Sequence, residues 1–193
     1  MSLKMTGKVW CCMKTISVEL KGSSPILMNR FPMEPIEGLA KKSKEEQAEI
    51  SAYRIPSKDD QLGELYVPGS AVFRTLINAG SYSKGKGRAT LAKIIAACIS
   101  IDNEYLGLGT TEYATDSRPV VNPSTKGRII KHRPMIVDWK ISFDLSYNEI
   151  LLTENQVRKV VDDAGMLVGL LDFRPACKGP FGRFKVSRWE TSS

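Results

Sequence analysis

Two segments of the chain alternate strictly between apolar and polar residues, and this pattern decides the class of fold. Every second residue of 139–147 is large and apolar, and the shorter segment 15–20 repeats the pattern. Successive side chains of a strand point to opposite faces, so each segment predicts a strand with one buried face. Strands of this kind need a cover on one side only, which favours an antiparallel sheet with helices on one face.

Helical patterns lie between these two strands. An exposed helix rich in Glu, Ala and Lys is predicted over 43–53. Two more apolar helices are predicted over 70–80 and 89–99, the first with Ser70 as its N-cap and Gly80 as its C-terminal glycine. Residues 101–125 contain glycines and prolines and are expected to form loops and short strands.

The C-terminal part of the chain completes the pattern. Thr153 and Gln156 match a capping box, and the helix that follows is expected to bury Leu167 on its apolar face. A last alternating segment, 183–189, predicts the final strand. Strand–helix–strand–strand–helix–strand is the split βαβ order of an α+β, ferredoxin-like (RRM-like) fold. Its second sheet face is left open, and nucleic-acid-binding domains of this topology use that face.

Length and composition indicate one soluble domain. The 193 residues, of which 42% are hydrophobic, suit a single domain over 1–193, and 30–64 is expected to be an insertion or an assembly loop. No apolar run is long enough to cross a bilayer, and lysines interrupt the start of the chain where a signal peptide would be apolar. Four cysteines without a C-x-x-C pair suit reduced thiols. We therefore expect a cytoplasmic protein that does not bind membranes.

The positive charge is concentrated in three segments without acidic residues. The net charge is +7, and these segments span 81–88, 126–133 and 174–188. A charged run is most often a solvated face, but three together, two of them rich in glycine, suit a phosphate backbone. Phe181 lies within the third segment and is expected to stack on a base. The predicted nucleic-acid ligands are Lys84, Lys86, Arg88, Lys126, Arg128, Lys131, His132, Arg133, Arg174, Lys178, Phe181, Arg183 and Lys185.

Two short motifs resemble a known family. Gly179-Pro-Phe-Gly-Arg-Phe184 lies between the last helix and the last strand, and Val67-Pro-Gly-Ser-Ala-Val-Phe-Arg74 opens an earlier helix. Both resemble the RAMP (repeat-associated mysterious protein) superfamily of CRISPR systems, whose ferredoxin-like domain carries a glycine-rich loop at the first position. The chain is closest in character to the RNA-coating backbone subunit of CRISPR effector complexes, and it also resembles bacteriophage proteins. No second insertion domain is evident in the sequence, and the loop alternatively suits a simple turn with Gly182 at positive φ.

Three functions follow as hypotheses. The first is a non-catalytic subunit that binds single-stranded RNA, in preference to DNA, and assembles with copies of itself or with CRISPR subunits. The second is a phage anti-CRISPR or decoy protein that mimics such a subunit. The third is a RAMP endoribonuclease with His132, the one histidine of the chain, as its base. No carboxylate cluster, metal-ligand spacing or nucleophile motif is found, so the sequence predicts neither an enzyme nor a bound cofactor.

Overall fold

A computed structural model provides the coordinates of the protein. The residues that it describes are 12–56, 62–85, 87, 89–121 and 125–191. Two of the predicted nucleic-acid ligands, Lys86 and Arg88, lie outside the described residues. Within the described part of the chain, no helix is both long and apolar enough to span a bilayer.

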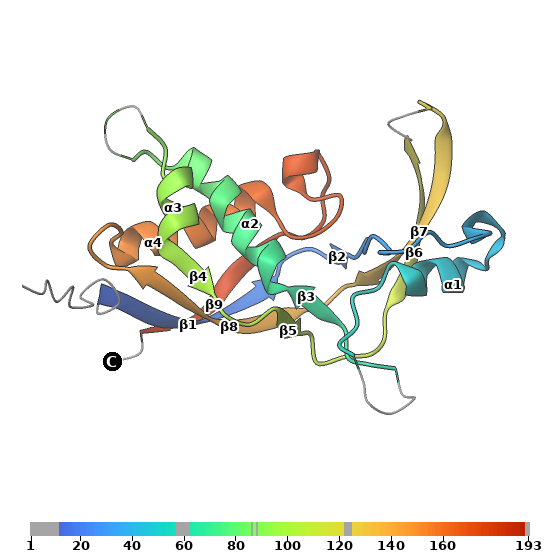
Figure 1. Cartoon of the computed structure of the whole chain (residues 1–193), viewed down its shortest axis with the longest axis horizontal. Helices are drawn as coiled ribbons and strands as arrows, with labels where there is room; N and C mark the ends of the chain where they lie inside the picture. The colour runs from blue at the N-terminus through green and yellow to red at the C-terminus, as the bar shows by residue number, and fades with distance from the viewer. Residues whose placement is uncertain (1–11, 57–61, 86, 88, 122–124, 192–193) are drawn as a thin grey trace, which may run out of the picture.

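Four antiparallel strands form the main sheet, in the order β4-β8-β1-β9 (Figure 1). In chain order the core consists of β1 (Met13–Gly22), α2 (Gly69–Ala79), β4 (Ile99–Ile101), β8 (Lys140–Asn148), α4 (Glu154–Asp163) and β9 (Phe184–Thr191). This is the strand–helix–strand–strand–helix–strand order, and the first and third core strands lie at the centre of the sheet. The predicted ferredoxin-like α+β fold is confirmed.

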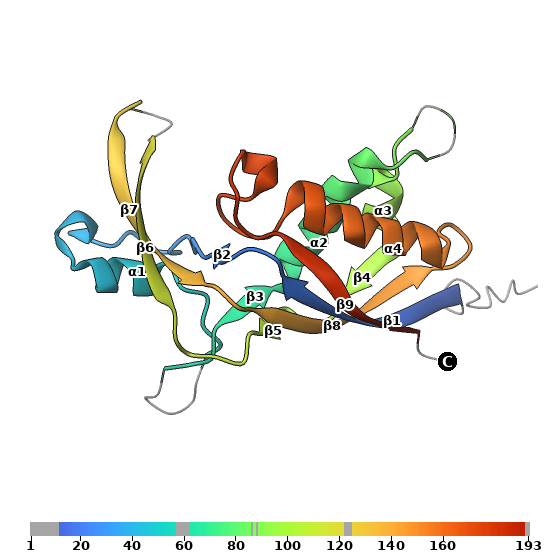
Figure 2. The same cartoon turned by 180° about the vertical axis from the view of Figure 1, so that it is seen from behind.

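The register of the two central strands explains the core. Ile16 lies opposite Leu145, and Leu20 lies opposite Ile141, so the alternating apolar residues of β1 and β8 share one face. These side chains are almost completely buried. Helices α2, α4 and α3 (Ala92–Cys98) cover this face, while the other face of the sheet stays open (Figures 1 and 2).

Helix α4 begins as predicted and ends differently. The Oγ1 atom of Thr153 accepts a hydrogen bond from the Gln156 backbone N–H at 3.3 Å, and the Gln156 side chain accepts one from the Thr153 N–H at 2.9 Å. The capping box is therefore confirmed. After Asp163 the chain continues as a π-helical turn, which rotates the following residues. The prediction that Leu167 is buried is wrong, because this turn leaves Leu167 37% exposed and buries Val168 instead.

The start of α2 differs from the prediction, whereas its end agrees with it. The helix begins at Gly69, so Ser70 is not its N-cap. The backbone N–H and the hydroxyl of Ser70 instead donate to the Glu104 carboxylate, at 2.9 and 2.7 Å. Gly80 ends the helix as predicted, with a right-handed φ of −56°. A Cβ at Gly80 would lie 2.9 Å from backbone atoms of Ala92, so close chain approach explains the glycine.

A second, smaller sheet that the sequence did not predict lies beside the core. The strands β2 (Ile26–Leu27), β7 (Arg128–Ile136) and β6 (Ala114–Val121) form a sheet in the order β2-β7-β6. Helix α1 (Lys44–Ile50), which confirms the predicted exposed helix, packs against β7. We call β6, β7 and α1 the hairpin lobe; it stands at one end of the molecule (Figures 1 and 2). A short pair, β3 (Tyr66–Pro68) and β5 (Tyr105–Gly107), lies between lobe and core.

Candidate nucleic-acid interface

Three cavities that share Asn29 in their linings run from α2 of the core to the space between β7 and α1 of the hairpin lobe. We call this row of cavities the groove. The first cavity, of about 310 Å³, lies against α2. The second, of about 620 Å³, separates the β6–β7 hairpin from residues 172–177. The third, of about 320 Å³, lies between β7 and α1.

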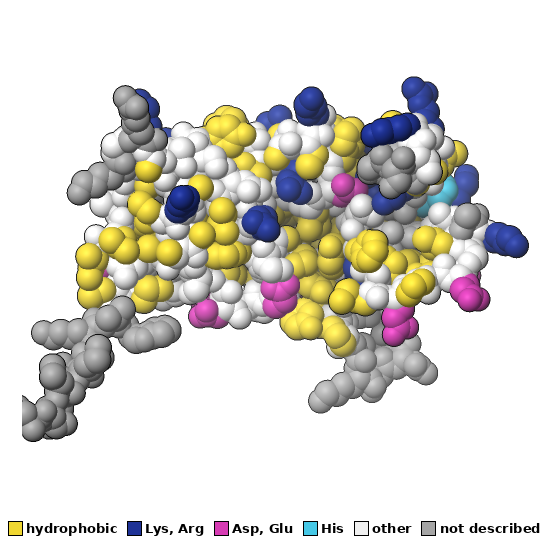
Figure 3. Space-filling view, turned by 45° about the horizontal axis from the view of Figure 1, so that its top comes forward, with side chains coloured by type: hydrophobic (Ala, Val, Ile, Leu, Met, Phe, Trp, Pro, Cys, Tyr) yellow, Lys and Arg dark blue, Asp and Glu magenta, His cyan; other side chains and the backbone are white. Residues whose placement is uncertain are grey.

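The groove is positively charged. Among the described residues that line it, six are Arg or Lys and one is acidic. The cations are Arg30, Arg74, Arg118, Lys131, Arg133 and Arg174, and the acidic residue is Asp172. In Figure 3, Lys and Arg side chains spread over the visible face, and most of the visible acidic side chains follow its lower edge. This excess of cations suits a polyanionic ligand.

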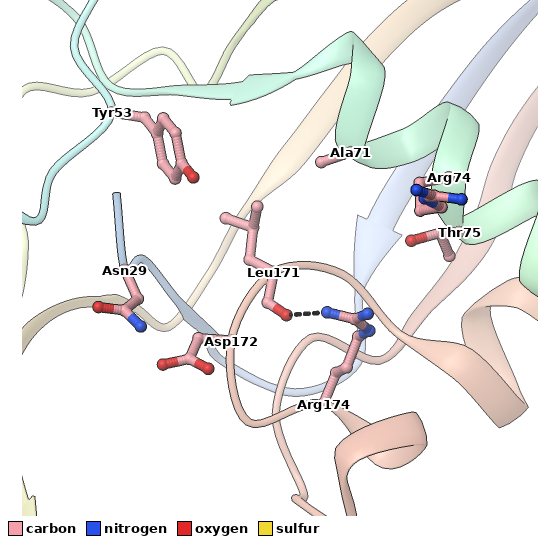
Figure 4. Close-up of a pocket in the computed structure, with 8 residues that line it drawn as sticks. All are labelled: Asn29, Tyr53, Ala71, Arg74, Thr75, Leu171, Asp172 and Arg174. Atoms are coloured by element: carbon pink, nitrogen blue, oxygen red, sulfur yellow. Dashed lines mark hydrogen bonds between the residues drawn. The ribbon is translucent and has the colours of Figure 1, made fainter. Parts of the chain in front are cut away.

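Two arginines from different elements line the first cavity (Figure 4). Arg74 projects from α2, and Arg174 comes from the loop below it. The Nη1 of Arg174 donates to the Leu171 carbonyl at 2.6 Å, while its Nε is buried and has no hydrogen-bond partner. Tyr53 lies across the cavity, where burial raises the pKa of its hydroxyl. Two guanidinium groups opposite an aromatic ring can hold a phosphate beside a base.

Arg133 joins the hairpin lobe to the core and is not a free ligand. Its side chain is 3% exposed, and its guanidinium donates to Asp172 at 2.6 Å and to Asp116 at 3.2 Å. Asp116 lies opposite Arg133 on β6, whereas Asp172 belongs to the loop of the core. The prediction that Arg133 contacts nucleic acid is therefore corrected: two carboxylates already neutralise a cation that solvent hardly reaches.

Phe181 is also placed differently from the prediction. Its ring is 8% exposed and lies under the Arg118 guanidinium, whose central carbon is 4.7 Å from the ring centroid. Phe173 packs beside it, with ring centroids 6.0 Å apart. A buried ring covered by a cation offers no free face for a base. The expectation that Phe181 stacks directly on a base is corrected for this reason, and Phe181 supports Arg118 instead.

The remaining cations of the second basic segment follow the hairpin. Lys126 and Arg128 are exposed near its tip, and Lys131 lines the groove. His132 lines the cavity next to α1, where its Nδ1 lies 2.7 Å from the hydroxyl of Ser117 on the facing strand. The structure thus brings Lys131, His132 and Arg174 to the groove, and leaves two cations at its outer end.

The glycine-rich loop before β9 is a constrained turn. Gly182 has the positive φ expected, 70°, and a Cβ there would overlap the Leu170 carbonyl oxygen. Lys178 is exposed, and Arg183 donates to the Met166 carbonyl at 2.7 Å. Lys185 points away from the helices on β9. The cations of this loop are therefore spread over several faces of the molecule.

Lys84 lies far from the groove. It is exposed on the loop between α2 and α3, at the end of the core opposite the hairpin lobe (Figures 1 and 2). The three basic segments therefore do not form one continuous surface within a single copy of the chain.

The open face of the main sheet differs from the expected aromatic platform. It carries small polar side chains that bond across the strands: Thr15 with Ser146 at 2.9 Å, and Ser17 with Asp144 at 2.6 Å. Ser187 donates to Glu19 at 2.8 Å. Within the described strands, no aromatic residue lies on this face. Base stacking on the sheet, as in RRM domains, has no platform here.

Sequence analysis missed several groove residues. Arg74 lies within the helix motif that resembles the RAMP superfamily, but it is an isolated cation. Arg118 follows Asp116 by two residues in a segment expected to be loops and short strands. Asn29 has no distinctive neighbours. A prediction of the β6–β7 pairing would have placed Arg118 opposite Lys131 on one face, and this pairing was the missing signal.

The described residues contain no group of three or more His, Cys, Asp or Glu side chains that could hold a metal ion. Cys12, Cys98 and Cys177 are all free thiols, in line with the reduced cysteines expected. The Glu104 carboxylate accepts hydrogen bonds from Ser70 at the start of α2.

Comparison with known proteins supports the fold alone. No protein-family model matches the sequence, and no curated protein matches it. A chain in the "Cryo-EM structure of the Type III-B Cmr-beta bound to cognate target RNA" matches with a TM-score of 0.52 and 10% sequence identity. The match covers 94% of this chain and 61% of that chain, so the protein spans under two thirds of the length of its structural neighbour. The protein therefore shares its fold with a chain of this Type III-B Cmr-beta structure.

Proposed function

We propose that the protein is a non-catalytic subunit that binds single-stranded RNA in the groove between its core and its hairpin lobe. The observation that carries this proposal is the groove lining, whose described residues include five cations besides the neutralised Arg133, and one carboxylate, Asp172, which pairs with Arg133. Phosphate contacts supply most of the affinity of proteins that bind nucleic acid without sequence preference. A groove of this charge favours such a ligand.

The size of the cavities favours a single strand. Volumes of about 310 to 620 Å³ suit one nucleotide at a time rather than a base-paired helix. The lining combines arginines with Tyr53 and with apolar residues of the hairpin. Cations for the backbone together with planar or apolar surfaces for the bases are the features of single-strand binding sites.

The proposal also specifies that the ligand is RNA and that the protein assembles with other subunits. The fold shared with a chain of an RNA-bound Type III-B Cmr-beta structure supports RNA as the ligand. Two large apolar side chains in the segment 30–64 support contact with a neighbouring copy or another CRISPR subunit. These are Phe31 and Met33, which are 83% and 88% exposed.

The test is binding of fluorescent oligouridine over a salt series. We expect Arg74→Ala and Lys131→Ala each to weaken binding and to reduce the slope of log affinity against log salt by about 0.7. Lys185→Ala is the matched control, because Lys185 is an exposed cation on the open face of the main sheet and does not line the groove. Equal effects of all three variants would contradict the groove as the site. Absence of binding would contradict the function and favour the anti-CRISPR or decoy alternative.

The non-catalytic part of the proposal concerns His132. Its Nδ1 is engaged by Ser117, and Lys131 precedes it on β7. General acid–base cleavage uses a base together with a second group, and among the described residues the Ser117 hydroxyl is the one side chain that hydrogen-bonds this imidazole. We expect end-labelled RNA to stay intact with the protein in the presence or absence of Mg²⁺. Cleavage that disappears in His132→Ala would establish the endoribonuclease alternative instead.

A further inference from the structure

The largest cavity of the groove lies between two walls, which come from the hairpin and from the loop of the core. One wall is a face of the hairpin. On this face Arg118 lies opposite Lys131, and Val120 lies opposite Ile129. The other wall includes Phe173 from the loop of the core. Its volume of about 620 Å³ exceeds that of the other two groove cavities. The apolar residues lie toward the tip of the hairpin, and the charged ones toward its base.

Arg118 is a fixed flat surface in this cavity. Its Nε donates to both carboxylate oxygens of Asp116, at 2.8 and 3.0 Å. Its guanidinium also lies over two aromatic rings, 4.7 Å from the Phe181 centroid and 5.6 Å from the Phe173 centroid. The side chain stays 34% exposed, although these contacts fix its head group. A guanidinium that is held in this way loses little entropy when a base stacks on it.

Polar groups surround the rest of the cavity. The Nζ of Lys131 donates to the Asn29 side-chain oxygen at 3.3 Å, which leaves the amide nitrogen of Asn29 without a partner among the hydrogen bonds of the described residues. Asn29 lines the cavity, so this free amide donor can serve an acceptor of a ligand that enters it. The heteroatoms of a nucleobase are acceptors of this kind.

We propose that this cavity receives one unstacked base of the bound RNA, with Arg118 as its stacking surface. Unstacked bases of single-stranded RNA stack on aromatic rings and on guanidinium planes, and hydrogen-bond through their edges. Here the aromatic pair of Phe173 and Phe181 supports the guanidinium, and the guanidinium contacts the base. This inference rests on the proposed function and adds a site for a base to a site for phosphates.

The test compares a twelve-nucleotide oligouridine with an abasic ribose-phosphate chain of the same length. Both carry the same phosphates, so their affinities differ by the contribution of the bases. We expect the wild-type protein to bind oligouridine about 5- to 150-fold more tightly, the range for one base stack. Arg118→Lys keeps the charge but loses the plane, so it should reduce this preference by weakening oligouridine binding more than abasic binding. Arg128→Lys, at the exposed tip, is the matched control and should keep the preference.

A second measurement does not depend on the variant. Oligouridine that contains 4-thiouridine should crosslink under near-ultraviolet light to peptides that include Ile129 or Cys177, which line the cavity. Equal loss of both ligands in Arg118→Lys, or crosslinks that map only elsewhere, would overturn the base site. RNA binding with no preference for bases overturns this inference alone, whereas no binding to either chain overturns the proposed function.

Discussion

The ferredoxin-like core and the hairpin lobe are held by different kinds of interaction. In the core, completely buried residues such as Ile16, Leu20 and Leu145 pack between the sheet and its helices. The lobe meets the core through the ion pair of Arg133 with Asp172, through the pairing of β7 with β2, and through Ile136 of β7, which belongs to the core cluster. Apolar packing stabilises without fixing direction, whereas ion pairs and hydrogen bonds need particular geometry. The Arg133–Asp172 pair is therefore a directed contact across the groove, beside the less directional apolar packing.

A second polar tie acts within the lobe. Arg54, which follows α1, donates to the carbonyls of Gly63 and Thr111 at 2.8 and 3.0 Å, and pairs with Glu49. Tyr113 donates to the same carboxylate at 2.9 Å. This network joins α1 to the segment that enters β6. Three predictions compare the two regions.

The largest effect is expected at the junction between the regions. Arg133→Ala leaves Asp172 and Asp116 without their shared cation, and removing one partner of a buried ion pair costs about 3–5 kcal/mol. We expect a loss in unfolding free energy at the lower end, about 3 kcal/mol, because Arg118 still pairs with Asp116. Urea denaturation measures the loss. Hydrogen exchange should accelerate in β6 and β7 much more than in β1 and β8.

Lys131→Ala is the control on the same strand. Lys131 lies two residues from Arg133, is partly exposed, and bonds Asn29 rather than a carboxylate. Its removal should change the unfolding free energy by less than about 0.5 kcal/mol. If Arg133→Ala accelerated exchange equally in core and lobe, the two regions would form one cooperative unit and the comparison would fail.

An intermediate effect is expected in the turn before β9, which belongs to the core. Gly182→Ala places a Cβ at positive φ and against the Leu170 carbonyl, so we expect a loss of about 2 kcal/mol. Gly38→Ala is matched in backbone conformation, with φ of 66°, but a Cβ there meets nothing within 4 Å. It should cost about 1 kcal/mol from the backbone alone. Equal losses, measured by thermal unfolding, would show that the overlap at Gly182 is relieved by movement of the loop.

The core could be predicted from the sequence, whereas the β6–β7 hairpin could not. The alternation in β1 and β8 and the capping box at Thr153 are local patterns, and they were sufficient to identify the fold of the core. The hairpin lobe has no such pattern. Charged residues lie on both faces of β7, and β6 contains Pro119, a residue that is unusual within a strand. Its partners, such as Asp172 for Arg133, are distant in sequence. Charge alone predicted Lys131 and Arg174 in the groove, but it could not separate them from the buried Arg133.

The smallest effect is expected from acid, at the polar tie within the lobe. The hydrogen bond from Arg54 lowers the pKa of Glu49 below its usual value, against an opposing effect of burial. A carboxylate with a lowered pKa stabilises the fold above its unfolded pKa, near 4.5, and this stabilisation is lost as pH falls through the folded pKa. Burial and the bond to Glu49 raise the pKa of Tyr113 to about 12, so this phenol stays protonated throughout the acidic range.

We therefore expect the unfolding free energy of the wild type to fall between pH 6 and pH 3, with the contribution of Glu49 below about 1 kcal/mol because its side chain is partly exposed. Glu49→Gln keeps the size of the side chain and removes its titration, so its pH profile should be flatter. Glu45→Gln is the control, because Glu45 lies on the same helix and forms no salt bridge among the described residues. If both variants flatten the profile equally, the acid sensitivity belongs to the general charge of α1 rather than to the tie with Arg54. The lobe would then depend less on directed polar contacts than its geometry indicates.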